Sequence, residues 1–281
     1  MWNICKVKIQ NIQIIKGDKN MKINKFKKLT IIITSLLTIG GLVGYSNTNN
    51  DVSDKNEIII GYDNTFVPMG YLDENGDTVG FDVDLATEAF KRMDINMKFQ
   101  SIDWSMKEAE LNSGNIDVIW NGYTLTEERK EKISYTDSYL DNKQIIVTLK
   151  TSNIKDKSDL EGKSIGTQTD SSGMEAVLKD TDFVKNLKNK EPVLYDTFDK
   201  AFRDLEIGRI DALVADEVLA RYYIAQKKDD MYKILEDNFG KEAFVVATKK
   251  ENTELRDKIN SILNEMKNDG TFDEIYSKWF K

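Results

Sequence analysis

The stretch Leu111-Asn-Ser-Gly114-Asn-Ile116-Asp117 decides the fold, because its pattern returns later in the chain as Leu205-Glu-Ile-Gly208-Arg-Ile210-Asp211. Both copies read L-x-x-G-x-I-D, and both run into apolar residues. A glycine that follows a helical pattern predicts the end of a helix, and the apolar residues after it predict a buried strand. The repeat therefore predicts two similar α/β halves.

Polar residues follow both repeats, and the two sets differ. The first strand runs into Asn121-Gly-Tyr-Thr124-Leu-Thr126-Glu-Glu-Arg129, and the second into Ala215-Asp216-Glu217. Ligands of open α/β sheets bind at the carboxyl ends of the strands. An arginine on one half and an aspartate on the other suit the two charges of a zwitterion. The pattern therefore predicts a receptor for an amino acid.

The composition excludes several classes of function. Residues 1–45 carry eight lysines and one aspartate, so the rest of the 281-residue chain holds 32 basic and 47 acidic residues, a formal charge of −15. Such an acidic chain lacks the basic surface of a nucleic-acid-binding protein. There is no histidine, and the one cysteine is Cys5, which excludes disulfides, cysteine zinc sites and Ser-His-Asp or Cys-His catalysis. We expect no catalytic residue, no metal and no cofactor.

Residues 1–45 are predicted to be a leader with Met21 as the true start, and residues 46–56 a polar tether. Lysines precede an apolar stretch from Leu29 to Val43, which is shorter than the roughly 20 residues that a membrane span needs. We therefore expect export, to the outer face of the cell membrane or the medium. The stretch before Tyr45 resembles a lipobox, but tyrosine has no thiol to lipidate. Release, an uncleaved anchor and a variant residue all stay open.

Alternating strand and helix patterns fill the rest of the chain and predict a mainly parallel sheet. Strands are expected at 57–61, 95–100, 116–120, 144–149, 160–166, 193–195, 212–214 and 243–247, with a hairpin over 71–79 closed by Asn75-Gly76. Helices are expected at 82–93, 104–112, 171–178, 199–205, 217–227, 254–267 and 271–279.

The pattern restarts at residue 160, which predicts a second lobe. The last strand and the last two helices follow the second lobe in the sequence, and we expect them to return to the first lobe. This assigns residues 57–142 plus 243–281 to lobe 1 and residues 143–242 to lobe 2. The chain then crosses between the lobes twice, near residues 139–143 and 238–243, and a hinge is expected there.

Arg129 and Asp216 are the strongest candidates for a binding site. Thr126 is a good N-cap for a helix that begins near Arg129, and the alternative is an ordinary solvated helix start. The position of this helix, soon after a strand end, favours a role for Arg129 in binding a carboxylate. Asp216 ends the second repeat's strand, and the alternative is that it only caps the following helix.

Aromatic and polar loops add further candidates. Phe66 and Trp104 follow strands and have polar neighbours, which favours a stacking platform over the alternative of core packing. Gln168-Thr-Asp-Ser-Ser172-Gly173 is a polar turn that enters a helix, where backbone N–H groups bind anions. Tyr123 and Trp120 suit the cleft and the core equally well.

Taken together, these stretches resemble the family-3 extracellular solute-binding proteins of ABC importers for polar amino acids. The resemblance covers residues 57–281 and is carried by Gly80-Phe-Asp-Val-Asp84-Leu-Ala, Asp103-Trp104, the first repeat, Gly122-Tyr-Thr-Leu-Thr-Glu-Glu-Arg129, Asp211-Ala, Asp216-Glu217 and the terminal Asp269-Gly-Thr-Phe with Tyr276-Ser-Lys-Trp279-Phe. It implies an α/β, two-lobed periplasmic-binding-protein fold (Venus-flytrap) with two hinge crossovers. The implied function is capture of an amino acid by hinged closure and its delivery to an ABC permease.

The resemblance also implies roles for individual residues. Arg129 would bind the ligand's α-carboxylate, helped by the backbone N–H groups of Thr124 and Ser172. The Gly122 carbonyl, the Thr124 hydroxyl and the Asp216 carboxylate would hold the α-ammonium. The ligand's side chain would meet Asp63, Phe66 and Trp104. The chain departs from the family at Met69, where an aromatic is frequent, at Asp170, where glycine is common, and at Tyr45.

The expected partners are a small polar amino acid, with cystine-like ligands included, and a permease, and the protein is expected to be a monomer. Two aromatic walls with few basic residues argue against acidic ligands. One alternative is a dehydratase-type enzyme on the same scaffold, with Asp63, Asp216 or Glu217 as its acid or base. Another is a sensory receptor domain that acts through a separate signalling protein.

Overall fold

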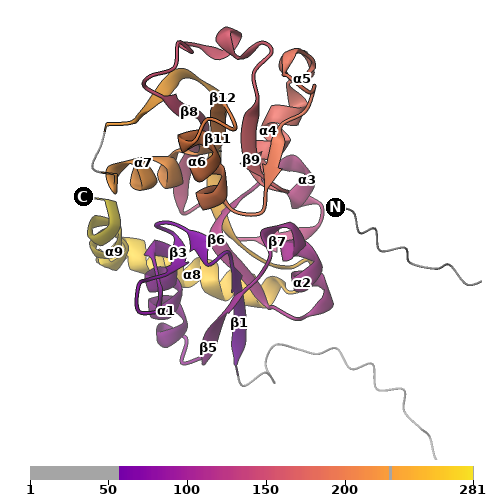
Figure 1. The fold of residues 1–281 in the computed structure, drawn as a ribbon. Coiled ribbons are helices and arrows are strands. Elements are labelled where there is room, and N and C mark those ends of the chain that lie inside the picture. Colours follow the sequence, from indigo (N-terminus) through magenta and orange to yellow (C-terminus); the bar gives the residue numbers. More distant parts are fainter. Residues whose placement is uncertain (1–56, 228–229, 281) are drawn as a thin grey trace, which may run out of the picture. The chain divides into compact units, whose positions relative to one another are not determined.

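The computed structural model describes residues 57–227 and 230–280, whose arrangement is shown in Figure 1. The main sheet consists of β1 (Ile58–Tyr62), β5 (Met97–Ser101), β6 (Val118–Thr124), β7 (Ile133–Tyr135), β8 (Leu140–Leu149), β9 (Ile165–Gln168), β10 (Val193–Tyr195), β11 (Ala212–Asp216) and β12 (Tyr232–Lys249). A small second sheet consists of β2 (Thr65–Phe66), β3 (Gly70–Leu72) and β4 (Thr78–Val79).

The helices alternate with these strands along the chain, as the sequence pattern predicts, and the last two follow the last strand. They are α1 (Phe81–Arg92), α2 (Lys107–Ser113), α3 (Glu127–Lys130), α4 (Ser172–Lys179), α5 (Thr181–Asn186), α6 (Phe198–Glu206), α7 (Glu217–Ala225), α8 (Thr253–Asp269) and α9 (Thr271–Phe280), with 3₁₀ turns at η2 (Trp104–Met106) and η3 (Lys157–Leu160). The predicted leader and tether fall outside the described residues. Within the described part, no helix has both the length and the apolar character that crossing a membrane requires.

The first lobe is built on three parallel strands in the order β6-β1-β5. Helix α1 buries the apolar face that its sequence predicts, including Leu85, Ala89 and Phe90. The last helix lies on α1, where the rings of Phe81 and Phe272 meet edge to face with centroids 5.8 Å apart. Helix α8 packs against both α1 and α9. The C-terminal helices thus pack on the first lobe, where α8 also contacts β7 and β12.

The second lobe repeats this scheme with three parallel strands in the order β10-β9-β11. Helix α6 contacts all three strands of this group and buries Ala201, Phe202 and Leu205. Helix α4 contacts β9 and β11. In Figure 1 the two lobes lie one above the other, with β8 and β12 running from one to the other.

Two long antiparallel strands join the lobes into one sheet. Strand β8 pairs with β11 of the second lobe, β12 pairs with β6 and β7 of the first, and β8 and β12 pair with each other. Asn142 and Glu242, after which the sequence analysis places the lobe boundaries, are direct cross-strand partners. Any hinge here would therefore bend a pair of hydrogen-bonded strands.

The sequence repeat has an equivalent structure in both lobes. The Asp117 backbone N–H donates to Ile59 O at 2.8 Å, and the Ile59 N–H donates to Asp117 Oδ2 at 3.0 Å. The Asp211 N–H likewise donates to Ser164 O at 2.8 Å, and the Ser164 N–H donates to Asp211 Oδ2 at 2.9 Å. Each aspartate thereby fastens the start of its strand to the neighbouring strand's start, which explains why the repeat ends in aspartate.

Some elements carry no clear local signal in the sequence. The first half of β12, with β2, β7 and α5, is not predicted, because charged residues and glycine interrupt the β12 pattern and pairing with β8 forms the strand instead. The hairpin over 71–79 is present, with Tyr71 opposite Val79. Its turn is wider than a two-residue Asn-Gly turn, because Asp73 Oδ1 accepts N–H bonds from Asn75 and Asp77, both at 2.9 Å.

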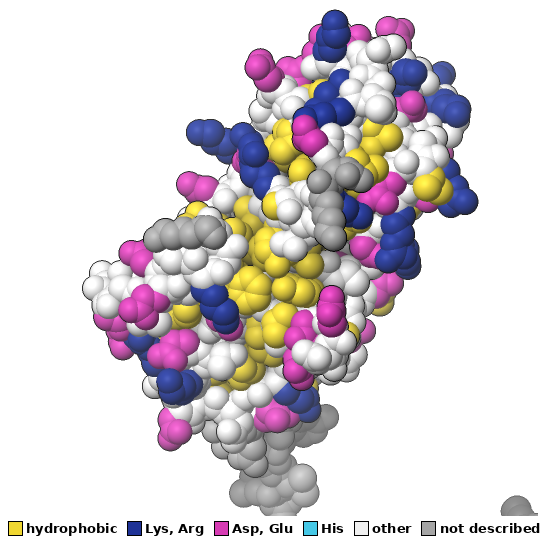
Figure 2. Space-filling view, turned by 60° about the vertical axis from the view of Figure 1, so that its left-hand side comes forward, with side chains coloured by type: hydrophobic (Ala, Val, Ile, Leu, Met, Phe, Trp, Pro, Cys, Tyr) yellow, Lys and Arg dark blue, Asp and Glu magenta, His cyan; other side chains and the backbone are white. Residues whose placement is uncertain are grey.

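Hydrophobic side chains also gather on one face of the molecule, the side where α7 and α9 lie (Figure 2). A groove of about 530 Å³ lies there between the two helices, lined by Glu217, Val218, Arg221, Tyr222, Ala225, Tyr276, Trp279 and Phe280. The hydroxyl groups of Tyr71 and Tyr222 come within 3.4 Å of each other. Helix α7 belongs to the second lobe and α9 packs on the first, so the two lobes also meet at this surface.

Candidate ligand site

The Asp63 carboxylate, just after β1, joins the two lobes. Thr65 donates its backbone N–H and its hydroxyl to Asp63 Oδ1, at 2.9 and 2.7 Å. Gln168, at the end of β9 in the second lobe, donates from Nε2 to Asp63 Oδ2 at 2.7 Å. Burial raises the pKa of Asp63, while these hydrogen bonds act in the opposite direction. Two predicted site residues are therefore bonded directly between the lobes.

The predicted aromatic residues lie together. The rings of Phe66 and Trp104 are nearly parallel, with centroids 6.5 Å apart and an angle of 10° between their planes. Both side chains are buried, as core packing would also require. Tyr123 and Trp120, which the sequence left open, are completely buried and belong to the core.

Gly122 lies on β6 at a point where the backbone requires glycine. Its φ is 56°, and a Cβ atom there would lie 2.7 Å from Phe66 Cε1. Its N–H donates to Asp82 Oδ2 at 2.7 Å, and the Tyr139 hydroxyl donates to the same oxygen at 2.9 Å. Burial raises the pKa of Asp82 to about 7. Asp82 therefore fixes the end of β6 from beneath the site.

Arg129 lies in the short helix α3, where the sequence predicts it. Thr126 caps this helix, because its hydroxyl accepts the Arg129 N–H at 3.3 Å. The guanidinium donates from Nη1 to Thr124 O at 2.9 Å and from Nη2 to Asp170 O, in the second lobe, at 3.0 Å. Arg129 is 4% exposed, so the alternative of a solvated helix start is wrong for this side chain.

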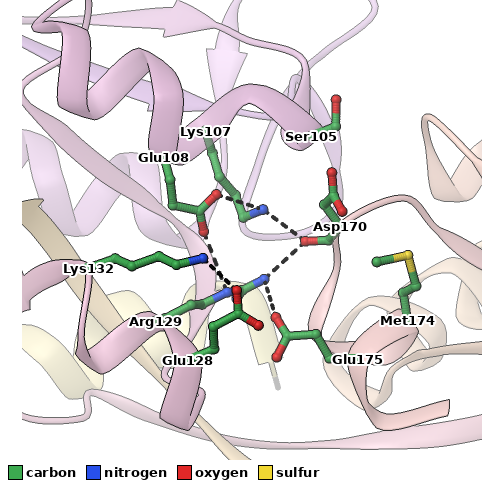
Figure 3. A pocket seen from close by; sticks show the side chains of 9 residues that line it. All are labelled: Ser105, Lys107, Glu108, Glu128, Arg129, Lys132, Asp170, Met174 and Glu175. Atoms are coloured by element: carbon green, nitrogen blue, oxygen red, sulfur yellow. Dashed lines mark hydrogen bonds and ion pairs between the residues drawn. The ribbon is translucent and has the colours of Figure 1, made fainter. Parts of the chain in front are cut away.

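Beside Arg129 lies a polar pocket of about 280 Å³ (Figure 3). It is lined by Ser105, Lys107, Glu108, Glu128, Arg129, Lys132, Asp170, Met174 and Glu175. Arg129 Nε lies 3.6 Å from Glu108 Oε1, and Nη2 lies 3.4 Å from Glu175 Oε1. Lys107 Nζ donates to Asp170 O at 2.8 Å. Burial, and then the charge of Arg129, lower the pKa of Lys107 to about 8.

Asp170 adopts the left-handed conformation, with φ 54°. The sequence analysis singles out this position as one where related proteins commonly have glycine. Aspartate tolerates this conformation better than most residues. The backbone carbonyl of Asp170 accordingly points to the first lobe and accepts from both Arg129 and Lys107.

Asp216 lies at the end of β11 and at the N-cap position of α7, but its side chain makes no capping hydrogen bond. Its Oδ1 instead accepts from Asn142 Nδ2 at 2.6 Å and from Gln144 Nε2 at 2.8 Å, both on β8. The alternative that Asp216 only caps the helix is therefore wrong. The Ser172 hydroxyl donates to Thr124 Oγ1 at 3.1 Å, which brings another pair of predicted residues together.

Glu242 on β12 is a residue that the sequence analysis missed. Its Oε2 accepts from Thr124 Oγ1 at 3.0 Å and lies 3.1 Å from Ser172 Oγ. The same oxygen accepts from Gln144 Nε2 at 3.0 Å and from Asn142 Nδ2 at 3.3 Å. One carboxylate oxygen thus faces donors from the first lobe, the second lobe and the strand between them.

Hydrogen bonds and close ring contacts connect the nine predicted site residues in small groups: Asp63 with Gln168, Phe66 with Trp104 and Gly122, Arg129 with Thr124, Thr124 with Ser172, and Ser172 with Asp216 through Gln144. Residues missed by the sequence analysis, namely Lys107, Asn142, Gln144 and Glu242, supply many of the connecting bonds. In the described part of the chain, no three His, Cys, Asp or Glu side chains are grouped in a way that would hold a metal ion.

Comparison with known proteins gives a consistent result. Residues 58–281 match the family model of the bacterial extracellular solute-binding proteins, family 3. A substrate-binding protein of an ABC uptake transporter from Streptococcus pneumoniae, solved with bound histidine, is 43% identical, with a TM-score of 0.78, and the match covers 80% of this chain and 92% of that one. An ancestral arginine-binding protein bound to arginine is 39% identical, with a TM-score of 0.74, over 81% and 99% of the two chains. The L-cystine-binding protein TcyJ of Escherichia coli (strain K12) is 28% identical over 82% of this chain and 85% of its own length.

Proposed function

Because the chain belongs to the bacterial extracellular solute-binding proteins of family 3, we propose that it is an extracytoplasmic receptor that captures a polar amino acid for an ABC importer. The observation that carries this proposal is the position of Arg129 and Asp216. A buried arginine of the first lobe and a buried aspartate of the second both lie close to the Thr124–Ser172 contact. A zwitterion that bridges the lobes would place one charge at each.

The α-carboxylate is proposed to bind Arg129. The ion pairs of this guanidinium with Glu108 and Glu175 are long, at 3.6 and 3.4 Å. A carboxylate that approaches in the plane of the guanidinium makes two shorter bonds, of about 2.7–2.9 Å. A ligand would therefore gain more from Arg129 than these glutamates do, and Ser172 lies at the start of α4, where backbone N–H groups attract an anion.

The α-ammonium is proposed to lie away from Arg129, on the side of Asp216. Its three N–H groups require acceptors. The Gly122 carbonyl, the Thr124 hydroxyl and the Asp216 carboxylate are the proposed set. The Ser172–Thr124 hydrogen bond, and the bonds from Gln144 to Ser172 and to Asp216, place the last two of these groups in one cluster.

The ligand's side chain is proposed to lie near Phe66, Trp104 and Asp63. The parallel rings supply flat apolar faces, and Asp63 supplies an acceptor. A polar side chain that donates hydrogen bonds, as in arginine, histidine or glutamine, suits this combination better than a carboxylate would. The matched proteins named above are a histidine-bound substrate-binding protein, an arginine-bound arginine-binding protein and an L-cystine-binding protein.

Transport by this receptor would depend on hinged closure. A ligand shifts the protein toward a closed form only if it contacts both lobes there and fewer groups in the open form. Arg129 and Asp216 lie on different lobes, so the proposed ligand meets this condition. The permease would then recognise the closed arrangement of the two lobes, and no chemical step on the ligand is required.

Calorimetric titration tests the proposal. Residues 46–281, without the predicted leader, would be unfolded and refolded to remove carried-over ligand and then titrated with L-arginine, L-histidine, L-glutamine and L-cystine. Submicromolar binding of one of them, lost in Arg129→Ala, supports the receptor. No binding of any amino acid would contradict it, and turnover of a prephenate-like acid would instead favour the dehydratase alternative.

A further inference from the structure

Asp216 and Glu242 present two carboxylates to the same pair of amide groups. Asn142 Nδ2 lies 2.6 Å from Asp216 Oδ1 and 3.3 Å from Glu242 Oε2. Gln144 Nε2 lies 2.8 Å from Asp216 Oδ1 and 3.0 Å from Glu242 Oε2. The two carboxylate oxygens therefore lie within two hydrogen-bond lengths of each other.

The hydrogen atoms at this cluster are fully used. Each amide nitrogen carries two hydrogens, but Gln144 Nε2 has three neighbours at hydrogen-bonding distance, namely Asp216, Glu242 and the Ser172 hydroxyl. The Gln144 carbonyl oxygen is buried and has no hydrogen-bond partner among the described residues. The cluster is thus rich in acceptors, and a further hydrogen donor would satisfy it.

The charges around the pair do not neutralise it. Lys143, on β8, lies 3.3 Å from the Glu217 carboxylate, at the start of α7. From the first lobe, Arg129 donates to the backbone oxygen of Thr124 rather than to either carboxylate. Burial, and then the charge of Glu242, raise the pKa of Asp216. Because both carboxylates face the same amide groups, a proton on Asp216 relieves the repulsion between them.

We propose that Asp216 and Glu242 together form the subsite for the ligand's α-ammonium, and that amino-acid binding expels a proton which the two carboxylates share in the free protein. This inference rests on the proposed function and deepens it, because it adds Glu242 to the site and links binding to pH. Thr124, which donates to Glu242, joins the subsite to the first lobe.

The protons and charges of this step balance. In the free protein the pair has a net charge of −1 and one shared proton. The ligand arrives as a zwitterion whose –NH₃⁺ group keeps its three hydrogens. The ammonium takes the place of the shared proton, which passes to the solvent, and the pair is left with a charge of −2 beside the ligand's positive charge. No bond within the ligand forms or breaks.

Proton release can be measured directly. L-Arginine and L-glutamine are suitable probes, because their side chains do not titrate near neutral pH. Calorimetric titrations at pH 7 in phosphate and in Tris, which differ in ionisation enthalpy, give the number of protons released. We expect about one proton per ligand bound, and a Kd that falls by up to about tenfold for each pH unit between 6 and 8.

Glu242→Gln keeps the size of the side chain and removes its charge. In this variant we expect proton release to fall close to zero and the pH dependence of Kd to flatten. The matched control is Glu236→Gln, an exposed residue on the same strand, which should behave as the unchanged protein does. Asp216→Asn is the second variant if Glu242→Gln does not fold. Unchanged proton release in Glu242→Gln would overturn the inference.

Two further measurements separate this inference from the proposed function. The 2-hydroxy acid analogue of the probe has no ammonium, so it should bind weakly and release no proton. Without any ligand, Glu242→Gln should reduce the loss of stability between pH 6 and 8, because Asp216 no longer faces a second charge. If the protein binds no amino acid but Glu242→Gln shows this smaller loss of stability, the receptor proposal is wrong and the shared proton is still supported. A protein that binds an amino acid without releasing a proton would contradict only the inference.

Discussion

Gln168 and Asp63, 105 residues apart in the sequence, are joined by a 2.7 Å hydrogen bond that ties the end of β9 to the residue after β1. Gln168 Nε2 also donates to Asp196 O at 2.9 Å, so one amide group uses both of its hydrogens. This amide is buried, and it holds a carboxylate that is itself buried. The bond therefore holds the two lobes together at this point and fixes the position of Asp63.

Gln168→Ala should weaken the contact between the lobes and leave Asp63 less firmly positioned. The net loss for a hydrogen bond to a charged group is about 1.5–3 kcal/mol, so we expect amino-acid affinity to fall by roughly ten- to a hundredfold. Calorimetric titration measures this change. Gln226→Ala, which removes an exposed glutamine after α7, is the control. Equal affinities in the two variants would show that the bond is not made in the ligand-bound form.

Arg129→Ala should cause the largest loss of binding among single changes at the site. Removing this guanidinium takes away the proposed partner of the α-carboxylate and also the cation that lies beside Glu108 and Glu175. We expect a loss of about a hundredfold or more in affinity. Arg221→Ala is the control, because Arg221 is an exposed arginine paired only with Glu217 in the described structure. Affinity near that of the unchanged protein would refute the site.

Gly122→Ala should destabilise the fold more than Gly208→Ala. Both glycines have positive φ, 56° and 72°, so an alanine at either position costs about 1–2 kcal/mol of backbone strain. Only at Gly122 would the new Cβ also press on a neighbour, Phe66, at 2.7 Å. At Gly208 there is nothing within 4 Å. Urea unfolding of both variants gives the comparison, and equal losses would contradict the close packing at Gly122.

The stability of the fold should decrease as the pH rises, partly through Asp82. The pKa of Asp82 is raised from 3.8 to about 7, so between these values the folded chain holds a proton that the unfolded chain has released. The contribution of Asp82 to the free energy of unfolding should therefore fall between pH 4 and pH 7, by up to about 4 kcal/mol, and level off above pH 7. Unfolding of the unchanged protein and of Asp82→Asn at pH 5 and pH 8 measures the Asp82 share. The variant should lose that share of the pH dependence whatever its absolute stability, and an unaltered pH profile would rule out Asp82 as its source.

Asp170→Gly should stabilise the protein without weakening ligand binding. Glycine adopts the φ of 54° with less strain, worth about 1 kcal/mol, and the backbone carbonyl that Arg129 and Lys107 bind is kept. Thermal unfolding and calorimetric titration measure the two effects. Lys190→Gly, at an exposed position with φ 59°, is the control for strain alone. Lost affinity in Asp170→Gly would assign the aspartate side chain its own role at the site.

The sequence predicted most of the fold because its signals were local. Periodic apolar residues, the repeat glycines and the Thr126 cap each specify a structure within a few residues of themselves. The first half of β12 had no such signal, since Glu236, Asp237 and Lys241 lie in a strand that exists through its pairing with β8. Elements of that kind depend on distant partners and escape a local analysis.

The same distinction explains the candidate site. Arg129, Asp216 and the loop residues follow strand ends, which a sequence marks clearly. Glu242 has no motif around it, and its place in the site can be recognised only from the pairing of β12 with β8. A signal was available on β8 itself, because Asn142 and Gln144 are polar residues two apart that precede the apolar run to Leu149. Because successive side chains of a strand point to opposite faces, both amides lie on one side of β8, next to Asp216.

The paired aspartates of the repeat have a consequence for how such a protein can change its cargo. Asp117 and Asp211 secure β6 and β11 where these strands begin, whereas Thr124 and Asp216 lie where the same strands finish. The residues that hold each strand in the sheet and the residues proposed to bind the ligand thus lie at opposite ends of β6 and β11. Substitutions at the ligand end can accumulate while the end that holds the strand stays intact, so one inherited framework can diverge toward new solutes without passing through an unfolded ancestor.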